Sequence, residues 1–284
     1  MMRIETVSLP SSGYGSKPVT LTVYAQDNVA AHEGRRRPAV IVCPGGGYGF
    51  CSDREAEPMA LAFVARGLQA FVLDYTVLDE DETRPLLPYP QQDLARAVAL
   101  VRENAEAWHV DADRIAILGC SAGGHLCATY TGLAQDAAFA AELGLAPEQI
   151  AVNAQILCYP VIDLCAGWPS DPELIPAICG EELVRAQELV SPVTPCTFVW
   201  HTAADDGVPV RNTYAYAATL AEAGVDHDCH VFHRGRHGLS LGTKQSAKNA
   251  TYENSHVAHW LDLAIEWLEE GFAEPDSDST SAEA

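Results

Sequence analysis

One stretch of the chain, residues 114–130 (RIAILGCSAGGHLCATY), restricts the fold more than any other. It opens with a short apolar run that has the length of a buried strand, and it ends with small and apolar residues typical of a helix packed on a sheet. Between the two lies the sequence Gly119-Cys120-Ser121-Ala122-Gly123. A side chain at either flanking glycine would collide with a neighbouring strand or helix, so the pattern predicts a tight strand-to-helix corner that carries a strained serine.

The remainder of the chain alternates between predicted strands and predicted helices. Residues 4–9 and 19–25 are predicted to form an antiparallel hairpin across a turn rich in Ser, Gly and Pro. Buried strands are predicted at 38–44, 70–75, 115–118, 154–161, 197–203 and 229–233, and further helices at 53–66, 92–108, 134–145, 212–223 and 254–270. This alternation predicts an α/β fold with a mostly parallel sheet of about eight strands and helices on both faces.

Length and composition favour one domain. With 284 residues, 48% of them hydrophobic, the chain can build one large core, and we expect residues 1–272 to form a single domain. Residues 163–191 interrupt the alternation and are predicted to be a small, lid-like insertion over the carboxyl edge of the sheet. Residues 273–284 are acidic and lack large apolar side chains, which predicts a disordered tail.

Charge and cysteine usage exclude several classes of partner. The formal net charge of −22 would repel nucleic acid and anionic membrane surfaces. No apolar run is long enough to cross a bilayer, and the first residues do not resemble a signal peptide, so we expect a soluble, cytoplasmic protein. The nine cysteines lack paired CxxC spacing and are predicted to be reduced, buried thiols. The sequence leaves open whether the chain forms a homo-oligomer.

A serine at such a corner needs partners before it can attack an ester. Its hydroxyl is a weak acid, so a neighbouring base must take the proton, and a third group must hold that base in one tautomer. Asp205 follows the strand predicted to end at 203, and His237 follows the last strand in a glycine-flanked loop, GRHG. Because such sheets bind ligands beyond the carboxyl ends of their strands, Ser121, Asp205 and His237 are predicted to meet there.

The acid is one of two adjacent residues. Asp205 is preferred because it leaves the strand end first, while Pro209 lets the loop turn back, and Asp206 is the reserve. The alternative is that both aspartates only cap the helix that begins near Asn212.

A metal site is one alternative interpretation of residues 227–233. His227, Cys229 and His233 would share one face of a strand, but no carboxylate or second cysteine pair shows ligand spacing, so no metal site is predicted.

The sequence PGGGYG after the strand 38–44 is a candidate oxyanion site. Residues without side chains let a substrate oxygen approach the backbone, and preorganised N–H groups stabilise the negative charge of a tetrahedral intermediate. We assign these donors to Gly46, Gly47 and Ala122. A phosphate cradle is the rival interpretation, but the three glycines lack the Gly-x-Gly-x-x-Gly spacing and no acidic residue follows at the ribose position.

Taken together, these motifs resemble a known family. The stretches PGGGYGF, SDREAEPMA, GCSAGGHLCA, HTAADDGVPV and GRHGLSL, spread over residues 38–241, are similar to the α/β-hydrolase superfamily, in particular to its hormone-sensitive-lipase-like and acetyl-xylan-esterase-like serine esterases. CPGGGY followed by REAEP resembles a branch of xylan esterases or sugar-ester hydrolases. One departure is that Pro44 replaces the first residue of the common HGGG motif.

The resemblance implies an activity and a mechanism. Ser121 would be the nucleophile, His237 the general base and then acid, and Asp205 the residue that orients the imidazole, with an acyl-serine intermediate and no metal or organic cofactor. The expected substrates are small-molecule esters with short, above all acetyl, acyl groups. Tyr48 and Phe50 are expected to line the substrate pocket. A serine peptidase or lactonase on the same fold, or a catalytically silent binding protein, are the alternatives.

Overall fold

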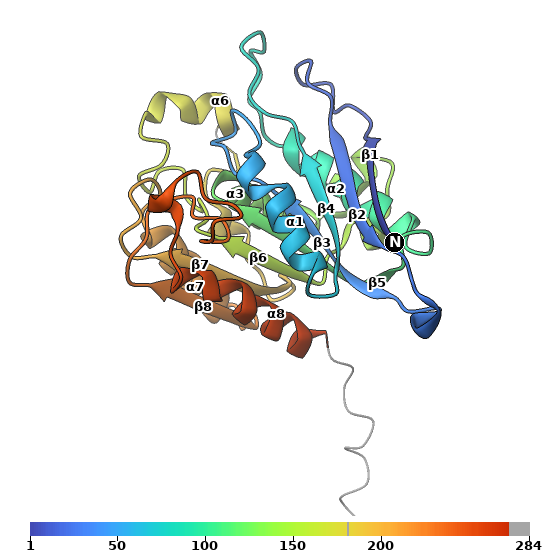
Figure 1. The fold of residues 1–284 in the computed structure, drawn as a ribbon. Coiled ribbons are helices and arrows are strands. Elements are labelled where there is room, and N and C mark those ends of the chain that lie inside the picture. The colour runs from blue at the N-terminus through green and yellow to red at the C-terminus, as the bar shows by residue number, and fades with distance from the viewer. Residues whose placement is uncertain (181, 273–284) are drawn as a thin grey trace, which may run out of the picture.

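The computed structural model, which describes residues 1–180 and 182–272, is built around an eight-stranded sheet (Figure 1). The strands lie in the order β1-β2-β4-β3-β5-β6-β7-β8. In chain order they are β1 (Met2–Ser8), β2 (Thr20–Gln26), β3 (Arg37–Cys43), β4 (Gln69–Asp74), β5 (Val110–Cys120), β6 (Ala154–Cys158), β7 (Cys196–Thr202) and β8 (His227–Phe232). β2 pairs antiparallel with β1 and β4, and every other neighbouring pair is parallel, so the prediction of a mostly parallel sheet is confirmed.

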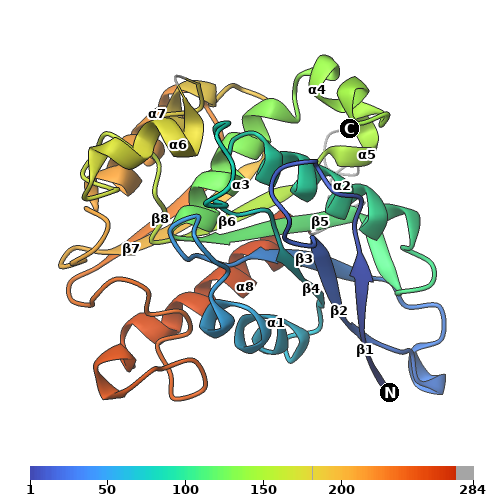
Figure 2. The same ribbon diagram turned by 90° about the horizontal axis from the view of Figure 1, so that it is seen from above.

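The helices cover both faces of this sheet, as predicted (Figure 2). The larger core lies under α2 (Tyr89–Glu103), α3 (Ala122–Leu133) and α7 (Arg211–Glu222). The smaller core lies under α1 (Glu57–Val64) and α8 (Trp260–Gly271) on the opposite face. Since β3 to β7 are buried from both sides, their sequences are almost continuously apolar, which is why they were identifiable as central strands.

Several helix boundaries differ from the predicted ones. The helix predicted at 53–66 is divided into a 3-10 turn, η2 (Asp53–Glu55), and α1, with non-helical backbone at Ala56. Pro58 explains the division, because it has no N–H to continue a helix from the preceding turn but is well accepted in a first turn. The last helix begins at Trp260 and not at 254, because Asn254 accepts a hydrogen bond from the Val257 amide and belongs to a capped turn.

The predicted helical piece at 134–145 is replaced by two short helices, α4 (Ala137–Glu142) and α5 (Pro147–Ile150). The 163–191 insertion contains α6 (Ile175–Cys179) between two 3-10 turns, η3 (Pro172–Leu174) and η4 (Ala186–Leu189). It is attached to the loop before α2 by hydrogen bonds from the Leu86 and Leu87 amides. The predicted tail, 273–284, lies outside the described residues.

The cysteines are free thiols, and most are buried or half-buried as expected. Cys165 and Cys229 are exposed, which corrects the prediction for these two positions.

Within the described ranges, no helix is both long and apolar enough to span a membrane.

Candidate active site

Ser121 lies at the corner between β5 and α3 in a strained conformation, with φ 54° and ψ −116°. The flanking glycines are required for the reason predicted from the sequence. A Cβ on Gly119 would lie 2.1 Å from the carbonyl oxygen of Gly123, and a Cβ on Gly123 would lie 2.1 Å from the carbonyl oxygen of Cys43. The nucleophile helix therefore rests on the backbone of the strand that carries the glycine loop.

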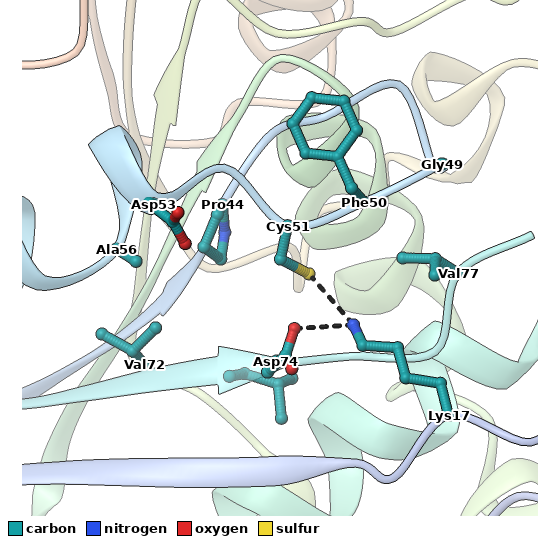
Figure 3. A pocket seen from close by; sticks show the side chains of 11 residues that line it. Lys17, Pro44, Gly49, Phe50, Cys51, Asp53, Ala56, Val72, Asp74 and Val77 are labelled. Atoms are coloured by element: carbon teal, nitrogen blue, oxygen red, sulfur yellow. Dashed lines mark hydrogen bonds and ion pairs between the residues drawn. The ribbon is translucent and has the colours of Figure 1, made fainter.

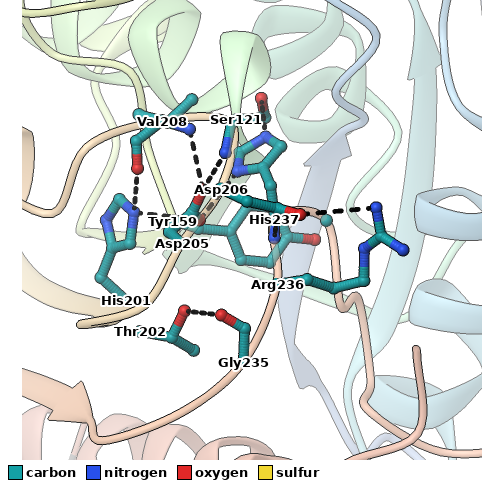
Figure 4. A network of polar contacts seen from close by, with 12 residues as sticks. Ser121, Tyr159, His201, Thr202, Asp205, Asp206, Val208, Gly235, Arg236 and His237 are labelled. Carbon is teal, nitrogen blue, oxygen red and sulfur yellow. Dashed lines mark hydrogen bonds and ion pairs between the residues drawn. The ribbon is translucent and has the colours of Figure 1, made fainter. Parts of the chain in front are cut away.

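The structure brings the three predicted catalytic side chains into line (Figure 4). The Ser121 Oγ lies 2.8 Å from Nε2 of His237, and Nδ1 of His237 lies 2.9 Å from Oδ2 of Asp205. The side chains of Ser121 and Asp205 are buried, whereas the His237 side chain is 23% exposed. Nδ1 bonds to an acceptor-only carboxylate, so the proton belongs on Nδ1 and Nε2 is free to accept the serine proton.

Asp205 is held by four donors. Its Oδ1 accepts hydrogen bonds from the Gly207 and Val208 amides, both at 2.8 Å, and its Oδ2 is shared between His237 and His201. Burial raises the pKa of Asp205, but hydrogen bonds from His201 and His237 outweigh burial and leave the pKa below its usual value. Asp205 therefore carries a negative charge at neutral pH.

Asp206 does a different job. Its Oδ1 accepts a hydrogen bond from the backbone amide of His237 at 2.8 Å, and its Oδ2 lies 3.6 Å from the Arg236 guanidinium. It steadies the loop without touching the imidazole. The geometry thus favours Asp205 over Asp206, and neither aspartate side chain caps the helix near Asn212.

The glycine loop, residues 44–50, is the candidate oxyanion loop and lies directly beside Ser121. A Cβ on Gly45 would lie 3.0 Å from Cβ of Ser121, and Gly46 and Gly47 have φ angles of 139° and 65°, which favour glycine. The Gly45 amide donates to the Glu55 carboxylate at 2.8 Å. The amides of Gly46, Gly47 and Ala122 have no acceptor among the described residues, which is what an oxyanion site requires.

Tyr48 does not occupy the predicted position. It was expected to line the substrate pocket, but its side chain is fully buried and its hydroxyl bonds to Nδ1 of His125 at 2.9 Å. Its φ of 62° turns the side chain inward, which the sequence could not reveal. Burial lowers the pKa of His125 to about 4, so this buried pair is neutral and anchors the glycine loop to α3.

Phe50 is exposed, as a substrate-contacting residue would be, with 61% of its surface accessible. It lines one side of a pocket of about 420 Å³ at the carboxyl end of β4 (Figure 3). The far wall holds the ion pair between Lys17 and Asp74, 2.6 Å apart. On the other side of the loop, Trp168 of the insertion lies against Gly47, 3.5 Å from where a Cβ would be.

Three residues near the site were missed from the sequence. His201 is fully buried, its Nδ1 bonds to the Thr213 hydroxyl, and its Nε2 bonds to Asp205 and to the Val208 carbonyl. Its place at the end of β7, four residues before Asp205, is a signal that could have been used. Tyr159 is buried against the His237 ring, and Glu55 is buried against the Tyr159 hydroxyl; these contacts join distant positions and leave no spacing to recognise.

His227, Cys229 and His233 do not form a metal-binding cluster. Nδ1 of His227 lies 2.8 Å from the Val225 carbonyl oxygen. In the described part of the chain, no group of three or more His, Cys, Asp or Glu side chains has an arrangement that could hold a metal ion.

Comparison with known families and proteins agrees with this geometry. The BD-FAE family model matches residues 27–220, and the prolyl oligopeptidase family model matches residues 177–267. Among curated proteins, endo-1,4-beta-xylanase B of Butyrivibrio fibrisolvens is 32% identical over 82% of this chain and 36% of its own length. The acetylxylan esterase of Xylanibacter ruminicola is 27% identical over 72% of this chain and 42% of its own.

The curated relatives are longer proteins, and the chain spans between about a third and a half of their length. A solved structure is matched over its whole length: the carboxylesterase Cest-2923 of Lactobacillus plantarum is 34% identical, with a TM-score of 0.88, over 96% of this chain and 100% of that one. The fold is therefore the α/β-hydrolase fold, and the chain belongs to the BD-FAE family.

Proposed function

We propose that this protein is a serine carboxylesterase that hydrolyses short-chain acyl esters, above all acetyl esters, of acetylated xylo-oligosaccharides or other sugars. The observation that carries the proposal is the line of Ser121, His237 and Asp205 beside a loop with unengaged amides. This combination supplies a nucleophile, a base and a site for developing negative charge, which are the three requirements of acyl transfer.

Each step follows from the geometry. His237 Nε2 removes the proton of Ser121 as Oγ attacks the ester carbonyl, and the resulting oxyanion accepts hydrogen bonds from Gly46, Gly47 and Ala122. The imidazolium, stabilised by Asp205, then protonates the leaving alcohol. Water attacks the acyl-serine with His237 again as base, which releases the acid and restores the hydroxyl.

A short acyl group fits the surroundings of the glycine loop. The indole of Trp168 lies against Gly47, 3.5 Å from where a Cβ would be, and we infer that it limits the length of the acyl group. In its described residues, 163–180 and 182–191, the insertion that carries Trp168 has short helical segments and no long apolar helix that could cover a lipid tail.

Sugar esters are supported by two further observations. Named relatives include an acetylxylan esterase and a xylanase. On this chain, the exposed ring of Phe50 and the charged Lys17–Asp74 pair offer an apolar face and polar groups beside the same loop, a combination suited to the flat faces and hydroxyls of a pyranose.

The test is a panel of p-nitrophenyl esters from acetate to decanoate, an acetylated xylo-oligosaccharide and a peptide anilide, with Ser121→Ala as control. We expect the acetate to be preferred, no activity in Ser121→Ala, and covalent labelling of Ser121 by an organophosphate. Phe50→Ala should raise KM for the acetylated oligosaccharide and leave p-nitrophenyl acetate unchanged. Activity that survives Ser121→Ala would end this mechanism, and an absence of both activity and labelling would favour a silent binding protein.

A peptidase is the second candidate, because the prolyl oligopeptidase family model matches the part of the chain that contains Asp205 and His237. The triad would serve either reaction, so the pocket decides. Cleavage of the peptide anilide at a higher kcat/KM than any ester would replace the esterase proposal; a lactone can be added to the panel for the same purpose.

A further inference from the structure

Glu55 is a carboxylate that the ester mechanism leaves without a role. It is 4% exposed and ends η2, five residues after Phe50. Its Oε2 accepts the Gly45 amide at 2.8 Å, and its Oε1 accepts the hydroxyl of Tyr159 at 2.7 Å. A buried carboxylate is costly unless it is hydrogen-bonded, so these two donors determine where it can lie. One of them belongs to the glycine loop.

The other donor, Tyr159, contacts the catalytic histidine (Figure 4). Its ring meets the His237 imidazole edge to face, with ring centroids 5.2 Å apart and an interplanar angle of 78°. Its φ of 39° is unfavourable for a bulky residue and requires support from the surroundings. Burial raises the pKa of Tyr159 well above its usual value, so the phenol keeps the proton that it donates to Glu55.

Residues next to Glu55 and Tyr159 fasten the histidine loop, residues 235–246, to η2. The Tyr159 hydroxyl accepts the Ser240 amide at 3.0 Å, and the Ser240 hydroxyl donates to the Arg54 carbonyl at 2.8 Å. The Arg54 guanidinium donates to the carbonyls of Gly238 and Ser246 at 2.9 and 2.7 Å. The imidazole is therefore fixed from the side that Asp205 does not reach.

The same carboxylate lies close to the nucleophile. A Cβ built on Gly45 would lie 2.7 Å from Oε2 of Glu55 and 3.0 Å from Cβ of Ser121. A shift of Glu55 would move the start of the glycine loop and the support of His237 together.

We propose that Glu55 is a positioning residue for the reaction. It fixes the position of the glycine loop through the Gly45 amide and the position of the His237 imidazole through Tyr159. The proposal rests on the proposed esterase function and assigns a shared support to two parts of the site that come from opposite sides of Ser121. Glu55 does not contact the substrate in this proposal. It acts on the reaction through its two hydrogen bonds and through the contact between the Tyr159 and His237 rings.

The experiment compares Glu55→Gln, Tyr159→Phe and the double variant with wild type, using p-nitrophenyl acetate. Glutamine has one acceptor oxygen where glutamate has two, so it must turn a donor amide toward either Gly45 or Tyr159. We expect kcat to fall at least tenfold in Glu55→Gln and threefold or more in Tyr159→Phe, with KM within twofold of wild type. The loss of kcat in the double variant should be smaller than the product of the two single losses, because the two side chains share one hydrogen bond.

Tyr130→Phe is the matched control, since Tyr130 is also fully buried and its hydroxyl also donates to one acceptor, the Ile150 carbonyl, away from the site. It should lower the melting temperature as Tyr159→Phe does, and leave kcat unchanged. Equal kcat in wild type, Tyr159→Phe and Tyr130→Phe would overturn the proposal, as would fully additive losses in the double variant. If Glu55→Gln fails to fold, Tyr159→Phe decides alone. Labelling of wild-type Ser121 by an organophosphate tests the esterase function separately.

Discussion

Two loops flank Ser121, and they are held in different ways. The glycine loop, residues 44–50, is the candidate oxyanion loop and is anchored by buried groups. The Gly45 amide bonds to Glu55, and the Tyr48 hydroxyl bonds to His125. The segment that presents His237 is anchored at its start by exposed charges. Asp206 and Arg236, which are 57% and 40% exposed, hold the backbone there, and Arg236 lies over the ring of Tyr252.

The difference teaches which half of the site depends on the core. Groups that receive developing charge must be preorganised, and buried anchors provide that rigidity. The same anchors make the loop sensitive to substitution, because a buried polar group that loses its partner is costly. The start of the histidine loop, at Asp206 and Arg236, can instead rest on solvated contacts that contribute little to stability. Substitutions in the oxyanion loop should therefore reduce both activity and stability, and those at the rim of the histidine loop should reduce neither by much.

The largest effect should come from the buried carboxylate that bonds to the His237 imidazole. Asp205→Asn should lower kcat by about 10⁴, because the amide cannot hold His237 in the tautomer that accepts the serine proton. Asp206→Asn is the matched control: it keeps an acceptor for the His237 amide and should change kcat by no more than a few-fold. Steady-state kinetics with p-nitrophenyl acetate measures both. A large loss in Asp206→Asn with little in Asp205→Asn would reverse the two assignments.

The next effect tests the oxyanion side. Alanine keeps the backbone N–H, but its Cβ would force the loop to move, so Gly46→Ala should lower kcat by up to about 10² to 10³, the usual cost of losing one oxyanion donor. It should also lower the melting temperature, because the new Cβ would lie 1.9 Å from the carbonyl oxygen of Phe50. Both quantities are measured on the same preparation. Near-wild-type kcat in a folded variant would show that the amide at this position does not hold the oxyanion.

The smallest effect concerns pH and the Tyr48–His125 anchor. The pKa of His125 is lowered from 6.5 in the unfolded chain to about 4 in the fold. Between these values the unfolded state binds more protons than the folded state. The contribution of neutral His125 to the free energy of unfolding is therefore complete above pH 6.5 and is lost as pH falls toward 4. From pH 7 to 4.5, wild type should lose about 2 kcal/mol more than His125→Gln. Urea unfolding at both pH values measures this difference, and equal losses would show that His125 is not held neutral.

The strands and the alignment of Ser121, His237 and Asp205 could be predicted from the sequence for related reasons. Central parallel strands are apolar throughout, so their ends are visible, and catalytic groups of this fold follow such ends in a fixed order. The corner at Ser121 was readable because both glycines are sterically required. Helix starts were less so: the turn at Ala56 and the capped turn at Asn254 depend on local contacts that periodicity does not reveal.

The supporting residues were not readable because they join positions far apart in the chain. The Tyr159 hydroxyl reaches Glu55 across a separation of 104 residues, and no motif spacing marks that contact. Tyr48 was placed on the wrong side of its loop because its side-chain direction is set by a backbone angle of 62°. Aromatic residues after a glycine run can face the pocket or the core, and the sequence alone does not separate the two cases.

The contact of Gly123 with the Cys43 carbonyl has a consequence for redesign. At this point α3 and β3 are in contact through main-chain atoms, so no side chain separates them. Their spacing should persist when the apolar residues on either face are exchanged for others of similar volume. If the proposed activity holds, libraries that change the interior of this protein while keeping Gly119 and Gly123 should yield active variants more often than libraries that vary those two positions.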